Sequence, residues 1–351
     1  MANTVPIHAL TLPQWGLETN TAPGTPSAPV AATKKMAVKD FLIRPIDAIA
    51  REQILKGLAI ANRGNEVVLQ RGVDWEVPET SMVYDELHYW FGMAVPGAPV
   101  KTGTGPFTWT STLDPTMASA STSSYHLRTI ELGLTSHVSS DNSDWEIPAA
   151  FLREIEFVGA ANNVVKMSAR GSGRRLQPST RTAALALFPI QEVPTALSKV
   201  YIDSTWASRG TTQITGQIIG WRFKIATGLH GQVTADGRSD LDYSVVLLNP
   251  DERRWSIEID MKAQLNTGQW QTEKTAAEAG TLRAVEIRTD FAGAVAYQTR
   301  FQALCKHTAG SVFPDGRENG EVTVKLSLEG STDDTNALAM IVTNNITAAI
   351  A

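Results

Sequence analysis

Two short strings of residues close the two halves of this chain in the same way. Val165-Lys-Met-Ser-Ala-Arg-Gly-Ser172 aligns with Val324-Lys-Leu-Ser-Leu-Glu-Gly-Ser331. Upstream of each string the order of elements is also shared, because an alternating strand and an amphipathic helix at 75–91 mirror those at 255–279. The strings alone could match by chance, but the common order strengthens the match. We interpret the chain as a tandem duplication divided near residue 175.

Both halves are predicted to be rich in β-strands. The segment 255–262 alternates apolar and polar residues, which is typical of a strand with one buried face. Its apolar residues are Trp255, Ile257, Ile259 and Met261, and its polar residues are Ser256, Glu258, Asp260 and Lys262. Further strands are predicted at 41–45, 66–70, 73–77, 126–132, 152–158, 164–169, 200–202, 217–224, 243–248, 283–288 and 321–328. One helix is expected in each half, one starting at 78–81 and one at 270–279.

Segments rich in Gly, Pro, Ser and Thr separate these elements. Residues 1–33 lack a sustained period and predict an extended or disordered N-terminal arm. Residues 95–124 predict a long loop, interrupted by the apolar Phe107 and Trp109. Residues 171–181 suit a linker. The predicted organisation is therefore an arm, a first domain over 34–175 and a second over 176–351.

Charge and cysteine content limit the possible functions. The 351 residues include 31 Lys and Arg against 36 Asp and Glu, a net charge of −5, which argues against a protein that clamps nucleic-acid phosphates. The single cysteine, Cys305, excludes an internal disulfide and a zinc finger. Neither a signal peptide nor an apolar run of the ~20 residues that a membrane span needs is visible. These features predict a soluble protein of a reducing cytoplasm without a membrane partner.

The residues that could carry chemistry are scattered. Asp85 and His88 have the spacing of a helical metal-binding pair, but most such pairs are simply solvated. Residues 236–242 resemble a calcium loop only faintly, because the terminal Glu is missing. Cys305 has no base beside it that the sequence can place in contact, so it is expected in the core. We therefore predict no enzyme, no catalytic residue, no cofactor and no metal.

The order of segments resembles a known family. The second half runs through 196–203, 217–223 and 233–238, then the strand from Trp255, a helix, a strand at 285–287 and closing strands at 321–330 and 339–344. The first half contributes Gly24-Thr25-Pro26 in the arm and the segment 147–171. In this order the chain is similar to the major tail tube proteins of bacteriophages with long, non-contractile tails, the siphoviruses.

The resemblance implies a structural virion protein. Its fold would be mainly β, with two tandem tail-tube-type β-sandwich or barrel domains, each with one flanking α-helix. Such domains close side by side into rings, and the rings stack into the hollow tail tube through which phage DNA is ejected. Family members usually carry one domain and form hexamers, so two domains per chain imply either trimeric, pseudo-hexameric rings or hexamers of larger subunits.

Partners and location follow from the same resemblance. The chain would assemble with itself in the host cytoplasm, reside in the virion tail, and contact the tape measure protein, the tail terminator and the tail tip proteins. Double-stranded DNA would pass through transiently and without sequence preference. A polar or acidic lumen would let DNA slide, because it offers phosphates no counter-charge.

Two sets of residues are candidates for these roles. Ser256, Glu258 and Asp260 are expected to face the lumen, since Ile257 and Ile259 suit the core; an ordinary solvent-facing strand surface is the alternative. Phe107 and Trp109 are expected to contact the neighbouring ring. The competing functional hypothesis is a β-sandwich receptor- or carbohydrate-binding module of a phage tail or baseplate, which would carry an exposed aromatic cluster or a calcium site.

Overall fold

The fold is mainly β, as predicted, and its strands pair antiparallel. The computed structural model describes residues 13–19, 28–51, 66–97, 99–113, 115, 126–134, 143–214, 218–233, 242–263, 268–292, 296–308, 314–318 and 321–347. Nineteen of the strands in these ranges belong to one connected hydrogen-bonded network, whereas β14 (Leu229–Gln232) and β15 (Val245–Leu248) form a separate pair.

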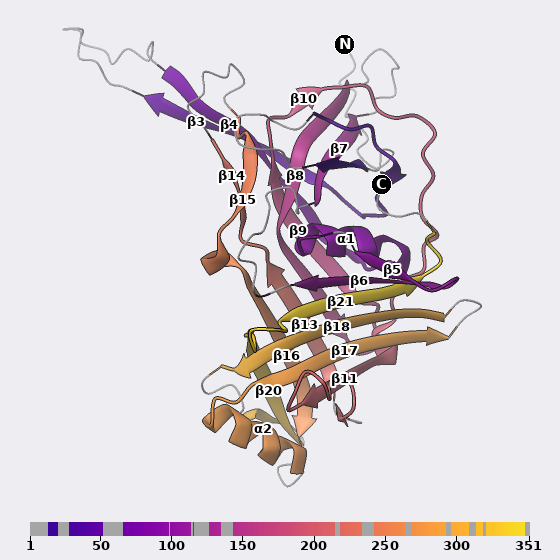
Figure 1. The fold of residues 1–351 in the computed structure, drawn as a ribbon, viewed down its shortest axis with the longest axis vertical. Helices are drawn as coiled ribbons and strands as arrows, with labels where there is room; N and C mark the ends of the chain where they lie inside the picture. The colour runs from indigo at the N-terminus through magenta and orange to yellow at the C-terminus, as the bar shows by residue number, and fades with distance from the viewer. Residues whose placement is uncertain are drawn as a thin grey trace, which may run out of the picture.

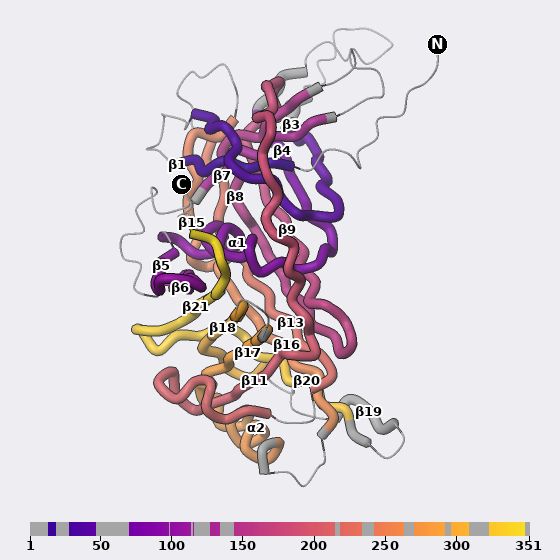
Figure 2. The backbone as a smooth tube through the Cα atoms, turned by 90° about the vertical axis from the view of Figure 1, so that its right-hand side faces the viewer, coloured from indigo at the N-terminus to yellow at the C-terminus, as the bar shows by residue number. Residues whose placement is uncertain are grey.

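One row of neighbouring strands, hereafter the long sheet, extends along the molecule (Figure 1). Each strand in it pairs antiparallel with the next. Its order is β3 (Leu42–Arg51), β4 (Glu66–Ser81), β9 (Lys166–Gly173), β8 (Ser143–Ala160), β13 (Ile218–Ala226), β16 (Arg254–Ala263) and β20 (Glu321–Gly330). Beyond β20 lie β19 (Pro314–Glu318) and the end of β18 (Ala296–His307). Figure 2 shows β3 and β4 near one end of the molecule and β19 and β20 near the other.

A second row of strands, hereafter the cross layer, runs across the long sheet (Figure 1). Its members also pair antiparallel in succession. The order is β12 (Gln213–Ile214), β11 (Ser198–Asp203), β17 (Arg283–Ala292), β18, β21 (Leu338–Asn344), β6 (Phe107–Leu113) and β5 (Val100–Thr102). At the other end of the molecule β8 also pairs with β7 (His126–Leu134) and β10 (Gln177–Pro178), and β1 (Gln14–Thr19) joins β7 to β2 (Lys34–Lys35).

The described residues of each half contain one α-helix, as predicted. Helix α1 spans Leu87–Ala94 after a short 3-10 turn at Tyr84–Glu86, and α2 spans Gly268–Glu278. Further 3-10 turns are found at Thr195–Leu197 and Pro250–Glu252. The predicted helix start at 78–81 is wrong, because β4 continues to Ser81. Pro78 cannot donate a ladder hydrogen bond, and the strand bypasses it with a register shift between Val77 and Thr80.

A cluster of aromatic rings joins the two layers and α1. Phe301 of β18 is 0% exposed and lies with its ring centre 5.7 Å from that of Phe91 on α1. The same ring is 4.8 Å from Phe157 on β8 and 5.0 Å from Phe223 on β13. These side chains come from both sides of residue 175. The two halves therefore share one core, which holds the long sheet against the cross layer.

Residue 175 does not separate two sheets either. β8, from the first half, pairs with β13, from the second, over Glu154–Ala160 and Gly220–Ala226. The predicted linker 171–181 is bound into the structure, because 171–173 belong to β9 and Arg174 forms a buried ion pair with Asp242 at 2.9 Å. The described strands thus show no boundary between two domains at residue 175, and the tandem division stays a prediction.

The repeated pattern appears in the strand register. Val77 faces Ala169 where β4 meets β9, and Ile257 faces Leu328 where β16 meets β20. These positions correspond in the aligned segments of the sequence. In both places the glycine of the repeated string, Gly171 or Gly330, lies against a tryptophan ring that leaves no room for a Cβ atom. The common glycine is therefore explained by close packing on Trp75 and Trp255.

The arm predicted over 1–33 is wrong in part. Residues 14–19 form β1, and Trp15 is 1% exposed, packed against Tyr89 and Trp90 of α1. Residues 1–12 and 20–27 lie outside the described part of the chain. The polar neighbours of Trp15 conceal this strand in the sequence, because its partner β7 lies more than 100 residues further along the chain.

A buried carboxyl group at the start of α1 predicts a pH dependence of stability. Burial raises the pKa of Glu86 from 4.5 to about 7, although the backbone N–H of Ala37 donates a hydrogen bond to it. The folded chain therefore holds a proton that the unfolded chain releases between these values, so stability falls as pH rises from 4.5 to 7. Glu86→Gln removes this loss. We expect the variant to be more stable than the wild type by ~3 kcal/mol at pH 8 and about equal to it at pH 4.5.

Urea unfolding of both proteins at the two pH values measures this difference. Asp85, whose pKa burial raises to about 6, is left unchanged in both and provides the common background. A difference in unfolding free energy that stays the same at both pH values would contradict the assignment.

Candidate lumen face and assembly edge

The long sheet has one apolar and one polar face. Ile257 and Ile259 are both 0% exposed and point into the core, as their alternation predicts. Ser256, Glu258 and Asp260 therefore lie on the opposite face, where each is partly exposed. The structure thus places the three predicted lumen residues together on one face. Whether that face lines a lumen depends on assembly and stays a prediction.

Charges on the polar face are arranged as a network of ion pairs, not as an acidic surface. Glu258 lies 2.9 Å from Lys325 on β20 and 3.6 Å from Arg222 on β13. Glu154 on β8 likewise lies 2.8 Å from Arg170 and 3.0 Å from Lys224. Each partly exposed pair adds little to stability. Their main consequence is that acids offset the bases on this face, so it offers phosphates few free positive charges.

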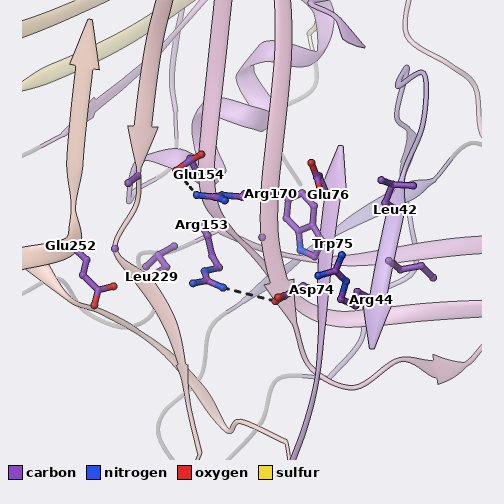
Figure 3. Close-up of a pocket in the computed structure, with 14 residues that line it drawn as sticks. Leu42, Arg44, Asp74, Trp75, Glu76, Arg153, Glu154, Arg170, Leu229 and Glu252 are labelled. Atoms are coloured by element: carbon purple, nitrogen blue, oxygen red, sulfur yellow. Dashed lines mark hydrogen bonds and ion pairs between the residues drawn. The ribbon is translucent and has the colours of Figure 1, made fainter. Parts of the chain in front are cut away.

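The same face is hollowed near β3. A groove of about 430 Å³ is lined by β3, β4, β9, β8 and the end of β13, with Leu229 of β14 and Glu252 on the side opposite β3, as Figure 3 shows. Arg153 reaches across it toward Asp74 at 4.0 Å, while Arg170 pairs with Glu154. Leu42 and Arg44 of β3 form the far wall of the groove. The polar face is therefore concave at this end, with paired charges on its floor.

The outer edge of the long sheet is open at β3. In the described part of the chain β3 pairs with β4 alone. Three large aliphatic side chains of this strand are exposed, namely Leu42 at 48%, Ile43 at 36% and Ile46 at 42%. An unpaired strand with exposed apolar residues invites pairing with another chain. The sequence pattern did not single out this edge, because Phe41-Leu-Ile43 has the composition of a fully buried strand.

The predicted loop over 95–124 is wrong where the structure describes it as strand. Residues 100–102 and 107–113 form the hairpin β5–β6, and β6 pairs with β21. Trp109 is 2% exposed and stacks on His88 with ring centres 5.0 Å apart, so it belongs to the core. Phe107 is only partly buried, and the Lys101 ammonium nitrogen lies 4.0 Å from the centre of its ring. Phe107 therefore remains the candidate for a contact between rings. Residues 98, 114 and 116–124 lie outside the described part.

The residues considered for chemistry do not form a site with one another. Asp85 and His88 are both buried, and burial lowers the pKa of His88 to about 3. Cys305 is 0% exposed, and burial raises its thiol pKa, so it is a core residue as predicted. Within the described ranges, no three His, Cys, Asp or Glu side chains gather so that they could hold a metal ion. Residues 236–241 of the predicted turn lie outside these ranges.

Neither described helix has the length and apolar character required to cross a membrane. The features that stand out in the described residues are a groove with paired charges and, next to it, the edge of β3, which no other described strand covers. Comparison with models of protein families and with curated proteins gave no match to this chain.

Proposed function

We propose that this chain is a major tail tube protein of a bacteriophage with a long, non-contractile tail. Copies would close side by side into rings, and the rings would stack into a hollow tube through which DNA leaves the virion. The observation that carries the proposal is the long sheet, which has one face packed on the core, a groove on the opposite face and, among the described strands, an unpaired edge at β3. Closure into a ring removes such an edge.

The repeated register supports two tube-type units within each chain. β3, β4, β9 and β8 form the first unit of the long sheet, and β13, β16, β20 and the end of β18 with β19 form the second. Three such chains give a pseudo-sixfold ring, which matches the hexamers that single-domain members of the family form. The tandem tail-tube domains of this proposal are thus repeats in one sheet, with one flanking helix each.

The charge pattern fits passage of DNA. In the proposed ring Ser256, Glu258 and Asp260 face the lumen, and the neighbouring bases are held by acids. DNA then meets few free cations and slides. Phe107 lies on the β5–β6 hairpin, which would contact the next ring. The family's tape measure, terminator and tip proteins would bind the assembled tube in the virion tail after assembly in the host cytoplasm.

A binding module of the tail or baseplate is less well supported. The large apolar side chains that are exposed in the described residues are all aliphatic: Val30, Leu42, Ile43, Ile46, Val100, Leu187, Ile190, Leu197, Ile219 and Val233. A carbohydrate-binding face would instead present aromatic rings. Negative-stain microscopy of the purified chain, alone and seeded with tail tips, tests the two functions. Hollow rods are expected, and a discrete oligomer at every concentration would overturn the proposal.

Reversing charges on the polar face should make the assembled protein retain DNA. In Glu258→Lys/Asp260→Lys, bases replace Glu258, which pairs with Arg222 and Lys325, and Asp260, which lies on the same face. We expect affinity for double-stranded DNA to rise at least about tenfold at 50 mM salt and to fall steeply by 200 mM. Co-sedimentation of tubes with DNA measures this. Glu278→Lys, on the exposed surface of α2, is the matched control. Equal retention by both variants would contradict a lumen position for Glu258 and Asp260.

A further inference from the structure

We infer that β3 of one copy pairs antiparallel with the end of β18 in a second copy, in the register that β13 and β8 use within the chain. The inference rests on the proposed function and names the contact that closes the ring. The strand that pairs with β3 belongs to a second copy of this chain. The chain already contains one example of such a joint, the pairing of β13 with β8.

The internal example joins the two units through β8 and β13. Ile225 faces Ile155, and Lys224 faces Glu156. The outer edge of β13 is covered there by β8, so that Phe223 is 0% and Ile225 2% exposed. This joint combines backbone pairing with apolar contact on the core face. On the polar face, the Lys224 ammonium group lies 3.0 Å from Glu154.

β3 is the counterpart of β13 in the first unit. Ile43 faces Trp75 on β4, and Ile225 faces the corresponding Trp255 on β16. The sequences agree as well, because Phe41-Leu-Ile43 corresponds to Phe223-Lys-Ile225. The two strands differ in burial. Ile43 is 36% exposed where Ile225 is 2% exposed, because among the described residues no strand covers the outer edge of β3.

The end of β18 is the counterpart of β8. Glu154 and Ile155 on β8 face Arg170 and Ala169 on β9. Lys306 and His307 face Glu329 and Leu328, the corresponding residues of β20. β8 has β13 on its other side, whereas Lys306 and His307 pair only with β20 among the described strands. β17 begins beside this end, where Arg283 faces Cys305, and the buried His307 ring lies 2.9 Å from Glu273 of α2, so only the backbone edge of β18 from Lys306 onward is offered to a second copy. The molecule thus carries the two halves of the internal joint separately, one at each end of the long sheet (Figure 2).

Transferring the internal register predicts which residues meet. Where Ile225 faces Ile155 within the chain, Ile43 of one copy would face His307 of the second copy. Where Lys224 faces Glu156, Leu42 would face Thr308 of the second copy. Arg44 then lies opposite Lys306. Each of these two bases has an acid across its own sheet, because Asp74 faces Arg44 and Glu329 faces Lys306. The four residues that lie side by side across the joint, Asp74, Arg44, Lys306 and Glu329, are therefore two acids and two bases, and their charges balance.

A cysteine cross-link tests the register. Directly opposed residues of antiparallel strands have Cα atoms within the range of a disulfide, whereas residues two positions out of register do not. Leu42→Cys/Thr308→Cys should therefore form a ladder of covalent oligomers when the full-length protein is oxidised with copper phenanthroline. Leu42→Cys/Lys306→Cys, which shares the same face but is out of register, is the matched control. Cys305 is buried and is kept in both.

The first variant should give at least about tenfold more cross-linked oligomer than the control. Both variants are also imaged for rods, and their fold is checked by circular dichroism. Rods without the expected ladder, or a stronger ladder from the control, overturn the joint and leave the proposed function standing. A folded protein that gives neither rods nor a ladder overturns both.

Discussion

Ile43→Lys is expected to abolish ring assembly and to leave a folded monomer. Ile43 is 36% exposed in the single chain, so a lysine there can extend into water at little cost to the fold. In the joint, however, the same ammonium group would lie on the core face, beside His307 of the next copy. Taking this charge out of water costs several kcal/mol, and a lysine on an edge strand is a known barrier to strand pairing.

The corresponding change in the internal joint should behave in the opposite way. Ile225 is 2% exposed, between Ile155 and Trp255, so Ile225→Lys introduces a charge into the core of every monomer. That change is expected to cost ~4 kcal/mol or more, enough to unfold many domains. Ile43→Val keeps the apolar contact and should assemble normally.

Three measurements separate these cases: circular dichroism for fold, light scattering on size exclusion for mass, and microscopy for rods. For Ile43→Lys the concentration needed for assembly should rise at least about 100-fold, which corresponds to ~3 kcal/mol. Normal rods from Ile43→Lys would show that β3 does not lie in the contact. An unfolded Ile43→Lys would show that this side chain already belongs to the core of the monomer.

Phe301→Ala is expected to destabilise the whole chain by ~3–5 kcal/mol. The Phe301 ring is fully buried, and its neighbours Phe91, Phe157 and Phe223 belong to α1, β8 and β13. Truncation leaves a cavity where the long sheet, the cross layer and the helix meet. Because these elements come from both halves, we expect one cooperative unfolding transition that shifts as a unit.

Urea unfolding followed by tryptophan fluorescence and circular dichroism measures the shift. Phe291→Ala is the control, since that ring is only partly buried and lies 6.5 Å from Tyr297; its loss should cost ~1 kcal/mol. Two separate transitions, of which only one responds to Phe301→Ala, would contradict a shared core and would show that the halves fold independently.

Local patterns in the sequence predicted the elements that have a clear period. The alternation from Trp255 to Lys262 gives β16 and correctly divides its two faces, and the helix formers after Trp270 give α2. The two matching strings also share a local environment, because each carries a glycine packed on a tryptophan. In each case the signal lies within about ten neighbouring residues, the distance over which side-chain period determines structure.

Features that depend on distant partners were missed. β6 is surrounded by Gly, Pro, Ser and Thr, and only its pairing with β21, more than 200 residues later, makes it a strand. The burial of Trp15 and Trp109 in the core was missed for the same reason, because their strands β1 and β6 pair with the distant strands β7 and β21. The edge at β3, which no second described strand covers, could not be predicted, since Phe41-Leu-Ile43 is even more apolar than its counterpart Phe223-Lys-Ile225, whose Phe and Ile are buried. What distinguishes the two strands is whether another strand lies beside them.

Electron cryo-microscopy of the assembled protein, viewed along the axis of the rods, shows how the chains join. We expect a hollow ring of three chains, in which the long sheets join into one continuous wall with Glu258 and Asp260 on its inner surface. A solid cross-section, or a wall that carries Glu258 and Asp260 on its outer surface, would contradict this expectation.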